Sequence, residues 1–102
     1  MTMEYQSKLR DDQVDMLFDS ILCLENREEC YRFFEDLCTV NEIKSLAQRL
    51  EVAIMLRKKY TYNEIAERTG ASTATISRVN RSLIYGSDGY NRILDKLEKK
   101  AD

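Results

Sequence analysis

Proline and histidine are both absent from the 102 residues of this chain, and glycine occurs only three times. Because proline is the residue that most strongly breaks a helix, its absence leaves helical patterns uninterrupted along the chain. Only Gly70, Gly86 and Gly89 punctuate these patterns. No segment shows the alternation that is typical of a β-strand. The sequence therefore predicts an all-α protein.

The absence of histidine also removes much of the chemistry of metals and catalysis. Cys23, Cys30 and Cys38 lie among apolar residues without a Cys-x-x-Cys pair, whereas zinc held by thiolates alone needs a full ligand set at close spacing. We interpret these cysteines as small hydrophobic residues in a reducing cytosol. The sequence also lacks a phosphate-binding glycine loop and a nucleophile with a base at a recognisable spacing. We therefore expect no enzymatic activity, no metal and no cofactor.

Long hydrophobic runs are missing too. Residues 1–8 lack the apolar core of a signal peptide, and the apolar run Val52–Leu56 is far too short to span a bilayer. Hydrophobic residues make up 43% of the chain and charged residues 33%, which suits one core with a charged surface. We therefore expect a single domain over residues 1–102, located in the cytoplasm, with no membrane partner.

Helical periodicity begins near the N-terminus. Residues 5–24 form the first predicted helix, with apolar side chains spaced as on one helix face: Val14, Leu17, Phe18 and Ile21. Two capping-box pairs predict the starts of the second and third helices: Asn26 with Glu29, and Thr39 with Glu42.

The third predicted helix extends to about Arg57 and is apolar nearly all round, which predicts a place in the centre of the core. Near the C-terminus, Gly86 is the predicted C-cap of one helix, and Ser87 or Asp88 is the predicted N-cap of the last one. The tail of that last helix, residues 98–102, is expected to fray.

Residues 62–85 have the layout of a helix-turn-helix. Thr61 can cap the first helix of the motif, and Glu64 completes a capping box with it. Gly70 follows, where the chain must take a left-handed conformation that glycine adopts cheaply. Ser72 is the natural N-cap of the second helix. Because this motif lays its second helix in the major groove, the layout predicts a protein that binds DNA.

The second helix of the motif divides into two faces. Ile76, Val79 and Leu83 recur at i, i+3 and i+7 and form one buried stripe. Ala66 keeps the first helix small where the two helices must approach closely. The outer face carries short polar groups, which can reach base edges, and arginines, which bind guanine or phosphate. An ordinary helical hairpin with a glycine C-cap is the alternative, but few hairpins combine this spacing with outward arginines.

Several residues are predicted to contact DNA. Four small ones at the start of the second helix are expected at base edges, with the alanine methyl offered to a thymine methyl: Ser72, Thr73, Ala74 and Ser77. Three arginines are expected at phosphates or guanines: Arg68, Arg78 and Arg81. The start of the first helix is placed for phosphate contact through two residues, Tyr62 and Asn63, and the basic step before it would attract the DNA backbone through Lys58 and Lys59.

The net charge of -2 argues against a protein that binds nucleic acid, but its distribution reverses that argument. Residues 1–56 carry 6 Lys/Arg and 12 Asp/Glu, for a net charge of -6, and residues 57–102 carry 10 and 6, for a net charge of +4. A polyanion responds to the local patch rather than to the total charge. The basic half, which contains the helix-turn-helix, is therefore expected to face DNA.

The first two predicted helices carry large aromatic and aliphatic faces, which one short chain would struggle to cover. These faces favour a homodimer in which they supply the contact; a compact monomeric bundle that buries them internally stays open. A dimer also suits DNA, because two recognition helices about 34 Å apart can read both halves of a palindromic operator.

A family resemblance rests on the run EIAERTGASTATISRVNRSLIYGSDGY, with Thr39–Glu42 and Leu46-x-x-Arg49 before it. On these residues the chain resembles the Trp repressor-like family, in particular its YerC/YecD branch. The resemblance covers most of the chain and is weaker in the first 25 residues. It implies a six-helix, all-α fold and an intertwined homodimer that binds double-stranded operator DNA as a transcriptional regulator.

The resemblance also marks a candidate effector pocket. In tryptophan-dependent members the corepressor lies between the long third helix and the recognition helix, and five positions here match that pocket: Thr39, Arg49, Thr75, Arg78 and Ser82. Val79 departs from the pattern, because tryptophan-binding members have a glycine there and a valine fills space that the indole needs. Overpacking of this kind costs about 1–3 kcal/mol. We hypothesise that tryptophan is not the effector, and any small-molecule effector stays unknown.

Ala66 is a second departure, because the tryptophan-responsive repressor has a lysine there that helps contact DNA. The target of this chain need not be the trp operator. The rival function is a protein-interaction module whose helix-turn-helix docks another regulator instead of DNA. A gel-shift with random duplex DNA at low salt separates the two.

Overall fold

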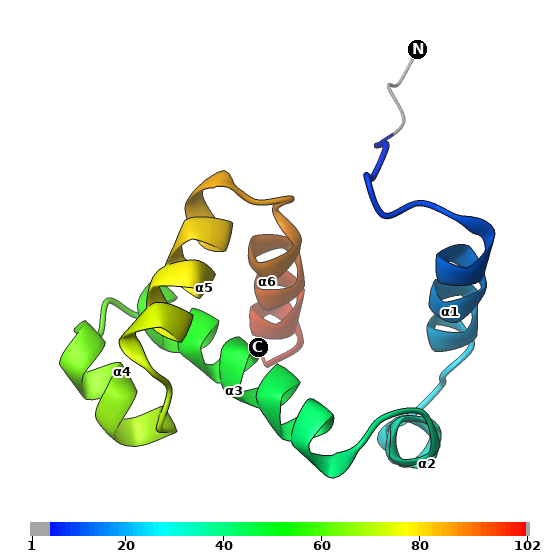
Figure 1. Cartoon of the computed structure of the whole chain (residues 1–102), viewed down its shortest axis with the longest axis horizontal. Helices are drawn as coiled ribbons and strands as arrows, with labels where there is room; N and C mark the ends of the chain where they lie inside the picture. The colour runs from blue at the N-terminus through cyan, green and yellow to red at the C-terminus, as the bar shows by residue number, and fades with distance from the viewer. Residues whose placement is uncertain (1–4, 102) are drawn as a thin grey trace. The chain divides into compact units, whose positions relative to one another are not determined.

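The structure is a computed structural model that describes residues 5–101. Within that range it consists of six α-helices (Figure 1), which confirms the all-α prediction. In chain order they are α1 (Asp12–Leu22), α2 (Arg27–Leu37), α3 (Val40–Arg57), α4 (Tyr62–Thr69), α5 (Thr73–Tyr85) and α6 (Gly89–Ala101). The chain splits into two compact units, which meet between Thr39 and Val40 in the sequence and are described separately. The prediction of one domain over residues 1–102 stays a prediction.

In the first unit, α1 begins later than the sequence pattern predicted. The predicted start at Tyr5 is wrong, because α1 begins at Asp12. The carboxylate of Asp11 accepts the N–H of Val14 at 2.8 Å and so acts as the N-cap. Before it, the Ser7 hydroxyl accepts the N–H of Leu9 at 3.0 Å in a local turn. These short polar side chains satisfy the backbone outside a helix, and apolar spacing alone does not reveal them.

The start of α2 is confirmed. Asn26 is the N-cap, and its side-chain oxygen accepts the N–H of Glu29 at 2.9 Å. The carboxylate of Glu29 reaches back to the N–H of Glu25 at 2.8 Å, one residue beyond the reciprocal partner of a standard capping box. Asn26 and Glu29 therefore fix the entry of the chain into α2 from both sides.

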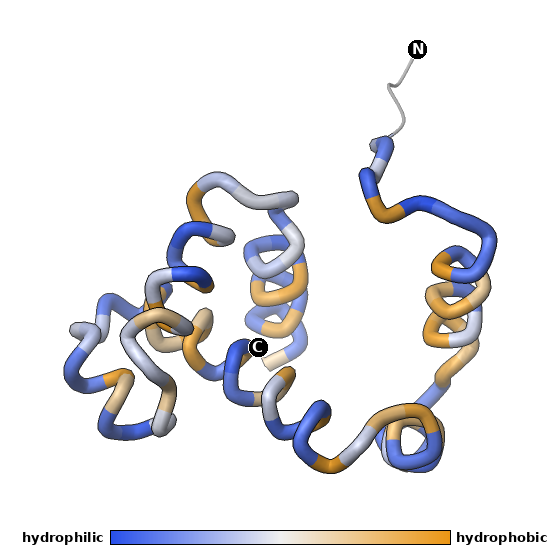
Figure 2. The backbone as a smooth tube through the Cα atoms, in the orientation of Figure 1, coloured by the Kyte–Doolittle hydropathy of each residue, from blue (hydrophilic) through white to orange (hydrophobic). Residues whose placement is uncertain are grey.

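Among residues 5–39 no side chain is buried. Apolar residues nevertheless recur along both helices, as the orange segments of α1 and α2 show in Figure 2. Exposed members of this set are Met16, Phe18, Leu22, Tyr31 and Leu37. Phe33 and Phe34 pack edge to face, with ring centroids 5.7 Å apart. All three cysteines are free thiols, and Cys23 and Cys30 are exposed rather than packed as small hydrophobic residues.

The second unit has a core around the C-terminal half of α3. α4, α5 and α6 each contact α3, and α5 also contacts α4 and α6 (Figure 1). The buried core consists of Val52, Ala53, Met55, Ile65, Ala71, Ile76, Val79 and Leu94. The prediction of a central third helix holds for this half only, because Leu46, nearer the start of α3, is exposed.

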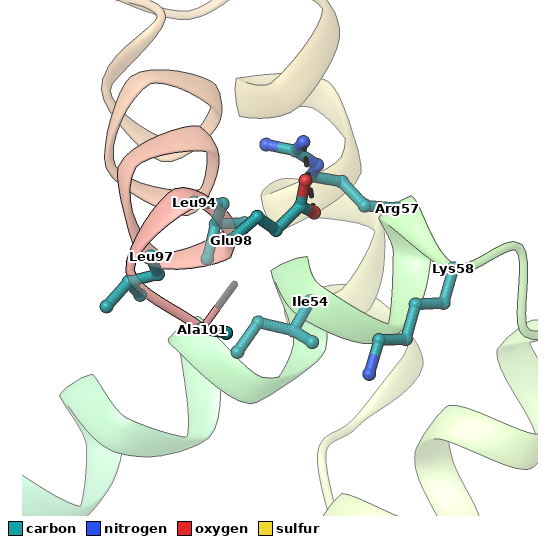
Figure 3. A pocket seen from close by; sticks show the side chains of 7 residues that line it. All are labelled: Ile54, Arg57, Lys58, Leu94, Leu97, Glu98 and Ala101. Atoms are coloured by element: carbon teal, nitrogen blue, oxygen red, sulfur yellow. Dashed lines mark hydrogen bonds and ion pairs between the residues drawn. The ribbon is translucent and has the colours of Figure 1, made fainter.

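An ion-pair cluster joins the end of α3 to α6. The guanidinium of Arg57 donates to the Asp95 carboxylate at 2.7 Å, to that of Glu98 at 3.5 Å and to the Asn91 carbonyl at 3.1 Å. The hydrogen bond that Arg57 donates to Asp95 is the main reason that the pKa of Arg57 is raised above its ordinary value. Arg57 and Glu98 help to line a hollow of about 300 Å³. Figure 3 shows their side chains directed toward one another. The remaining lining residues of the hollow are Ile54, Lys58, Leu94, Leu97 and Ala101.

Both ends of the α5–α6 connection differ from a simple glycine turn. Gly86 is the C-cap of α5, as predicted, but its φ of -82 lies in the ordinary range. Glycine is needed there because a Cβ would collide with the backbone carbonyl of Ser82. α6 begins at Gly89 and runs through Ala101, so the predicted fraying from residue 98 is wrong up to Ala101, and Asp102 lies outside the described residues.

None of the described helices combines the length and apolar character that crossing a membrane requires.

Candidate nucleic-acid interface

The first helix of the motif starts where the sequence predicted, but among the described residues only the Thr61 half of the predicted capping box forms. The Thr61 hydroxyl caps α4 by accepting the N–H of Glu64 at 3.2 Å. Ile65 is fully buried, and Ala66 is half-buried against the same core. A small residue at position 66 therefore lies where α4 meets the core that it shares with α5.

The turn between α4 and α5 is fixed by a chain of hydrogen bonds. Gly70 takes the predicted left-handed conformation, with φ 73. Thr69 donates its hydroxyl to the Ile65 carbonyl at 2.7 Å and accepts the N–H of Ala71 at 3.1 Å. Gln48 on α3 donates to the Thr69 carbonyl at 3.1 Å. Sequence reasoning missed Thr69 and Gln48, because a contact across 21 residues leaves no spacing signal.

The Ser72 hydroxyl caps α5 as a hydrogen-bond acceptor and also acts as a donor. Its oxygen accepts the N–H of Thr75 at 3.1 Å, and its proton is donated to Thr75 Oγ1 at 3.1 Å. A hydroxyl carries one proton, so Ser72 can offer a base only its remaining lone pair. Ser72 is therefore placed to fix the start of α5, and its predicted base contact is restricted to a donor group.

The outer face of α5 gathers five of the predicted DNA-contact residues. Thr73, Ala74, Ser77, Arg78 and Arg81 are all exposed. They form two adjacent rows with a spacing of four residues, so they lie side by side along one face of the helix. The opposite face is closed, because Ile76 is 0% and Val79 2% exposed. The structure thus separates the two faces as predicted, while contact of the outer face with DNA stays a prediction.

The predicted contacts outside α5 are also accessible. Tyr62 and Asn63 are exposed at the start of α4. Arg68, in the last turn of α4, is exposed, and its guanidinium lies over the ring of Tyr60, 4.9 Å from the centroid. The sequence gives no reason to pair Arg68 with Tyr60, eight positions earlier and outside the helix, so this contact was not predicted.

The basic step before α4 lies at the surface. Lys58 and Lys59 are exposed. Lys59 has a positive φ of 68, which is uncommon for a residue with a side chain. Its N–H donates to the Leu56 carbonyl at 3.0 Å, and the N–H of Tyr60 donates to Met55 at 3.1 Å. These bonds close the end of α3 with Lys59 where a glycine is more usual.

The predicted effector residues lie on several elements, and their role as a pocket stays a prediction. Thr39 belongs to the first unit, and Val79 is part of the core of the second. Arg49 donates to the Ser45 hydroxyl, one turn away, at 3.0 Å. Ser82 lines a shallow hollow of about 490 Å³ beside α3, α5 and α6, together with Leu50, Gly86, Ser87, Gly89, Tyr90 and Ile93. Arg49, Thr75 and Val79 are not among the residues that line it.

Acidic and cysteine side chains do not cluster as metal ligands do. Among residues 5–101 no group of three or more such residues is placed to hold a metal ion. The arrangement around α5 instead combines an exposed polar face, two exposed arginines and a rigid turn. This chemistry can bind a polyanion and read its bases.

Comparisons with known proteins agree on one family. Residues 12–98 match the family model described as Trp repressor protein. YerC from Bacillus subtilis, an uncharacterized protein, is 63% identical over 92 residues, which cover 90% of this chain and 88% of that protein.

Two solved structures are similar in fold and sequence. One is a candidate Trp repressor from Staphylococcus aureus, with a TM-score of 0.86 and 64% identity over 89% of this chain and 91% of that one. The other is a TrpR-like protein from Eubacterium eligens, with a TM-score of 0.86 and 62% identity over 89% of this chain and 94% of that one.

Proposed function

The chain belongs to the Trp repressor family, and from this premise we propose that it is a homodimeric, sequence-specific DNA-binding regulator of transcription that does not respond to tryptophan. The family is regulatory and binds DNA rather than catalysing a reaction. In the proposed complex, α5 enters the major groove of a palindromic operator, and the start of α4 contacts the phosphate backbone.

The observation that carries this proposal is the division of α5 into a closed face and an open one. Ile76 and Val79 tie the helix to the core, so its orientation is fixed before any partner arrives. The side chains of Thr73, Ser77 and Arg81 remain exposed along the other face. A rigid helix that presents short polar groups and arginines matches the chemistry of base edges and phosphates.

The division of charge supports the same assignment. Residues 1–39 carry 4 Lys/Arg and 10 Asp/Glu, for a net charge of -6, whereas residues 40–102 carry 12 and 8, for a net charge of +4. The helix-turn-helix thus lies in the basic unit. Because phosphate contacts supply most of the sequence-independent affinity, we assign the DNA interface to the second unit.

The unburied apolar faces of α1 and α2 support a homodimer. Phe18 on α1 is 50% exposed, and no residue of either helix is buried. Exposed faces of this kind mark an interface in soluble proteins. We assign them to contact with a second copy of the chain, which would also supply the second recognition helix that a palindrome requires.

The burial of Val79 supports independence from tryptophan. Its side chain is 2% exposed and belongs to the core beside Ile76. An indole placed against that face of α5 would have to displace a packed valine, and such overpacking costs about 1–3 kcal/mol. Calorimetric titration with L-tryptophan is expected to show no saturable binding. Saturable binding at micromolar ligand would contradict this part of the proposal.

Selection of bound duplexes from a random pool tests the DNA-binding proposal. A recovered palindrome would give the target and the half-site spacing together. On that duplex, Arg81→Ala should weaken binding and reduce the slope of log affinity against log salt by about one. Lys96→Ala on α6 removes an equally exposed charge away from α5 and should leave the slope unchanged. If no duplex is enriched and the chain retains no random DNA at low salt, the proposal fails.

A further inference from the structure

Tyr60 lies at the joint between the core and the proposed DNA-binding motif. It immediately precedes Thr61, the N-cap of α4. Its backbone N–H donates to the Met55 carbonyl at 3.1 Å, and its side chain packs, partly buried, against the core. The backbone and the ring of Tyr60 are therefore both held by contacts with the second unit, and the ring offers a surface beside α4.

Arg68 uses that surface instead of the acidic partner that its spacing offers. Glu64 lies one turn before it on α4, the separation at which Glu–Arg ion pairs form on a helix. Within residues 5–101, however, Arg68 makes no ion pair, and its guanidinium lies 4.9 Å from the centre of the Tyr60 ring. The stack holds the charged group by its flat face.

This choice of partner leaves the donors of Arg68 available. A guanidinium presents five N–H groups around its edge, and stacking on an aromatic ring does not occupy them. A salt bridge to a carboxylate would occupy two of them and cancel the charge. The stack also brings the guanidinium from the last turn of α4 back to Tyr60. Tyr60 directly follows Lys58 and Lys59, which are two further exposed cations.

We infer that Tyr60 is a positioning residue that holds Arg68 ready to bind a DNA phosphate at the entrance to α4. The inference rests on the proposed function and adds to it a role for a residue outside the helix-turn-helix. A guanidinium held in place before binding loses less conformational freedom when it meets the phosphate. Tyr60 itself touches no nucleic acid in this account, and its effect acts through Arg68.

A matched pair of substitutions tests the role of the ring. Tyr60→Phe keeps the aromatic face and removes only a hydroxyl that makes no hydrogen bond among the described residues, so binding of mixed-sequence duplex at low salt should be unchanged. Tyr60→Leu keeps an apolar side chain against the core but loses the attraction for a cation. It should weaken binding by about two- to fivefold without changing the salt slope.

A double-mutant cycle with Arg68→Ala separates positioning from structural damage. Arg68→Ala should weaken binding and reduce the salt slope by about one. In that background Tyr60→Leu should cause no further loss, whereas damage to the fold would weaken binding in both backgrounds. Additive losses, or full affinity in Tyr60→Leu, overturn the inference while the DNA-binding proposal stands. If the unsubstituted chain binds no duplex, both fail, and that single measurement shows it.

Discussion

The two units of the chain contain helices of similar amphipathic character, yet only one of the units has a core. In the second unit, α4, α5 and α6 surround the C-terminal half of α3, and eight of its described residues are buried. In the first unit, α1 and α2 are 11 residues each, and within residues 5–39 none is buried. The difference lies in the number of helices that share one centre, because a helix buries its apolar face only against another element.

The units also differ in the range of their polar contacts. The contacts that cap α1 and α2 join residues three or four positions apart, such as Asp11 to Val14. In the second unit, Arg57 reaches Asp95 across 38 positions. Long-range contacts need a core to hold their ends together, so they occur where the core is. This comparison predicts that the second unit folds by itself, whereas the first depends on a partner surface.

The largest effect is expected from opening the core of the second unit. Ile76→Ala removes a fully buried side chain from α5 and should lower the free energy of unfolding by about 2–5 kcal/mol. Ile84→Ala, on the same helix but at a residue 61% exposed, should change it by less than about 0.5 kcal/mol. Urea unfolding followed by circular dichroism measures both. Equal losses would show that α5 is not anchored by its buried stripe.

A second experiment tests whether the exposed apolar face of the first unit forms the dimer interface. Phe18→Asp places a charge on the exposed apolar face of α1 and should raise the dissociation constant of the dimer by at least about tenfold. Because Phe18 belongs to no core formed by residues 5–101, the helices of the second unit should stay folded. Asp19→Ala, at the next residue of α1, is the control and should dimerise normally. Sedimentation velocity over a range of concentrations gives the answer, and unchanged association in Phe18→Asp would remove α1 from the interface.

A smaller effect is expected from removing the long-range contacts that Arg57 makes with α6. Arg57→Met should lower the melting temperature, and the loss should shrink at high salt because Asp95 and Glu98 are exposed partners. Arg92→Met breaks the exposed pair with Asp88, one turn away, and should have little effect. If both variants melt alike, the joint between α3 and α6 adds nothing beyond an ordinary surface pair.

The pH dependence of that joint follows from the raised pKa of Arg57. A cation with a pKa raised by folding stabilises the protein fully below its unfolded pKa and loses that contribution as pH rises through the folded pKa. For an arginine this window lies in strongly alkaline solution. Arg57 therefore stays charged between mildly acidic and mildly alkaline pH. Its titration should not change the stability difference between Arg57→Met and the unsubstituted chain over that range, as thermal melts can check.

The smallest effect concerns backbone conformation. Among the described residues those with positive φ all lie in the second unit: Lys59, Gly70 and Asp88. Lys59→Gly should raise stability by about 0.5 kcal/mol, because a side chain in this conformation costs more than the extra backbone freedom of glycine. Asp88→Gly is the control and should bring no gain, since it loses the contacts with Asn91 and Arg92. A destabilised Lys59→Gly, measured by urea unfolding, would show that Lys59 is not strained.

Most helix starts were predictable, because a cap depends on residues only three positions apart. Asn26, Thr61 and Ser72 accept the N–H groups that their sequence spacing assigned to them. The start of α1 was missed because apolar periodicity outweighed Asp11, an equally local signal. The fold family was predictable as well, since the run around the helix-turn-helix is long and specific.

The candidate site was predictable where one helix decides it. The exposed face of α5 follows from the period of the helix and the position of Ile76 and Val79. The residues assigned to that face are all exposed: Thr73, Ala74, Ser77, Arg78 and Arg81. The effector residues are not decided by one helix, so their role as a pocket stays a prediction. They come from several elements, and a gathering of Arg49, Thr75 and Ser82 depends on how those elements pack.

By itself, the sequence determined which segments become helices, where most of them begin and which side of α5 can meet a partner. Caps and faces are set by neighbours within one or two turns, and these neighbours are visible in the sequence. Only the tertiary structure decided that Arg68 stacks on Tyr60, that Gln48 holds the turn at Thr69, and that Arg57 joins α3 to α6. Each of these contacts exists because helices around one core bring distant residues together, and no local pattern encodes that distance.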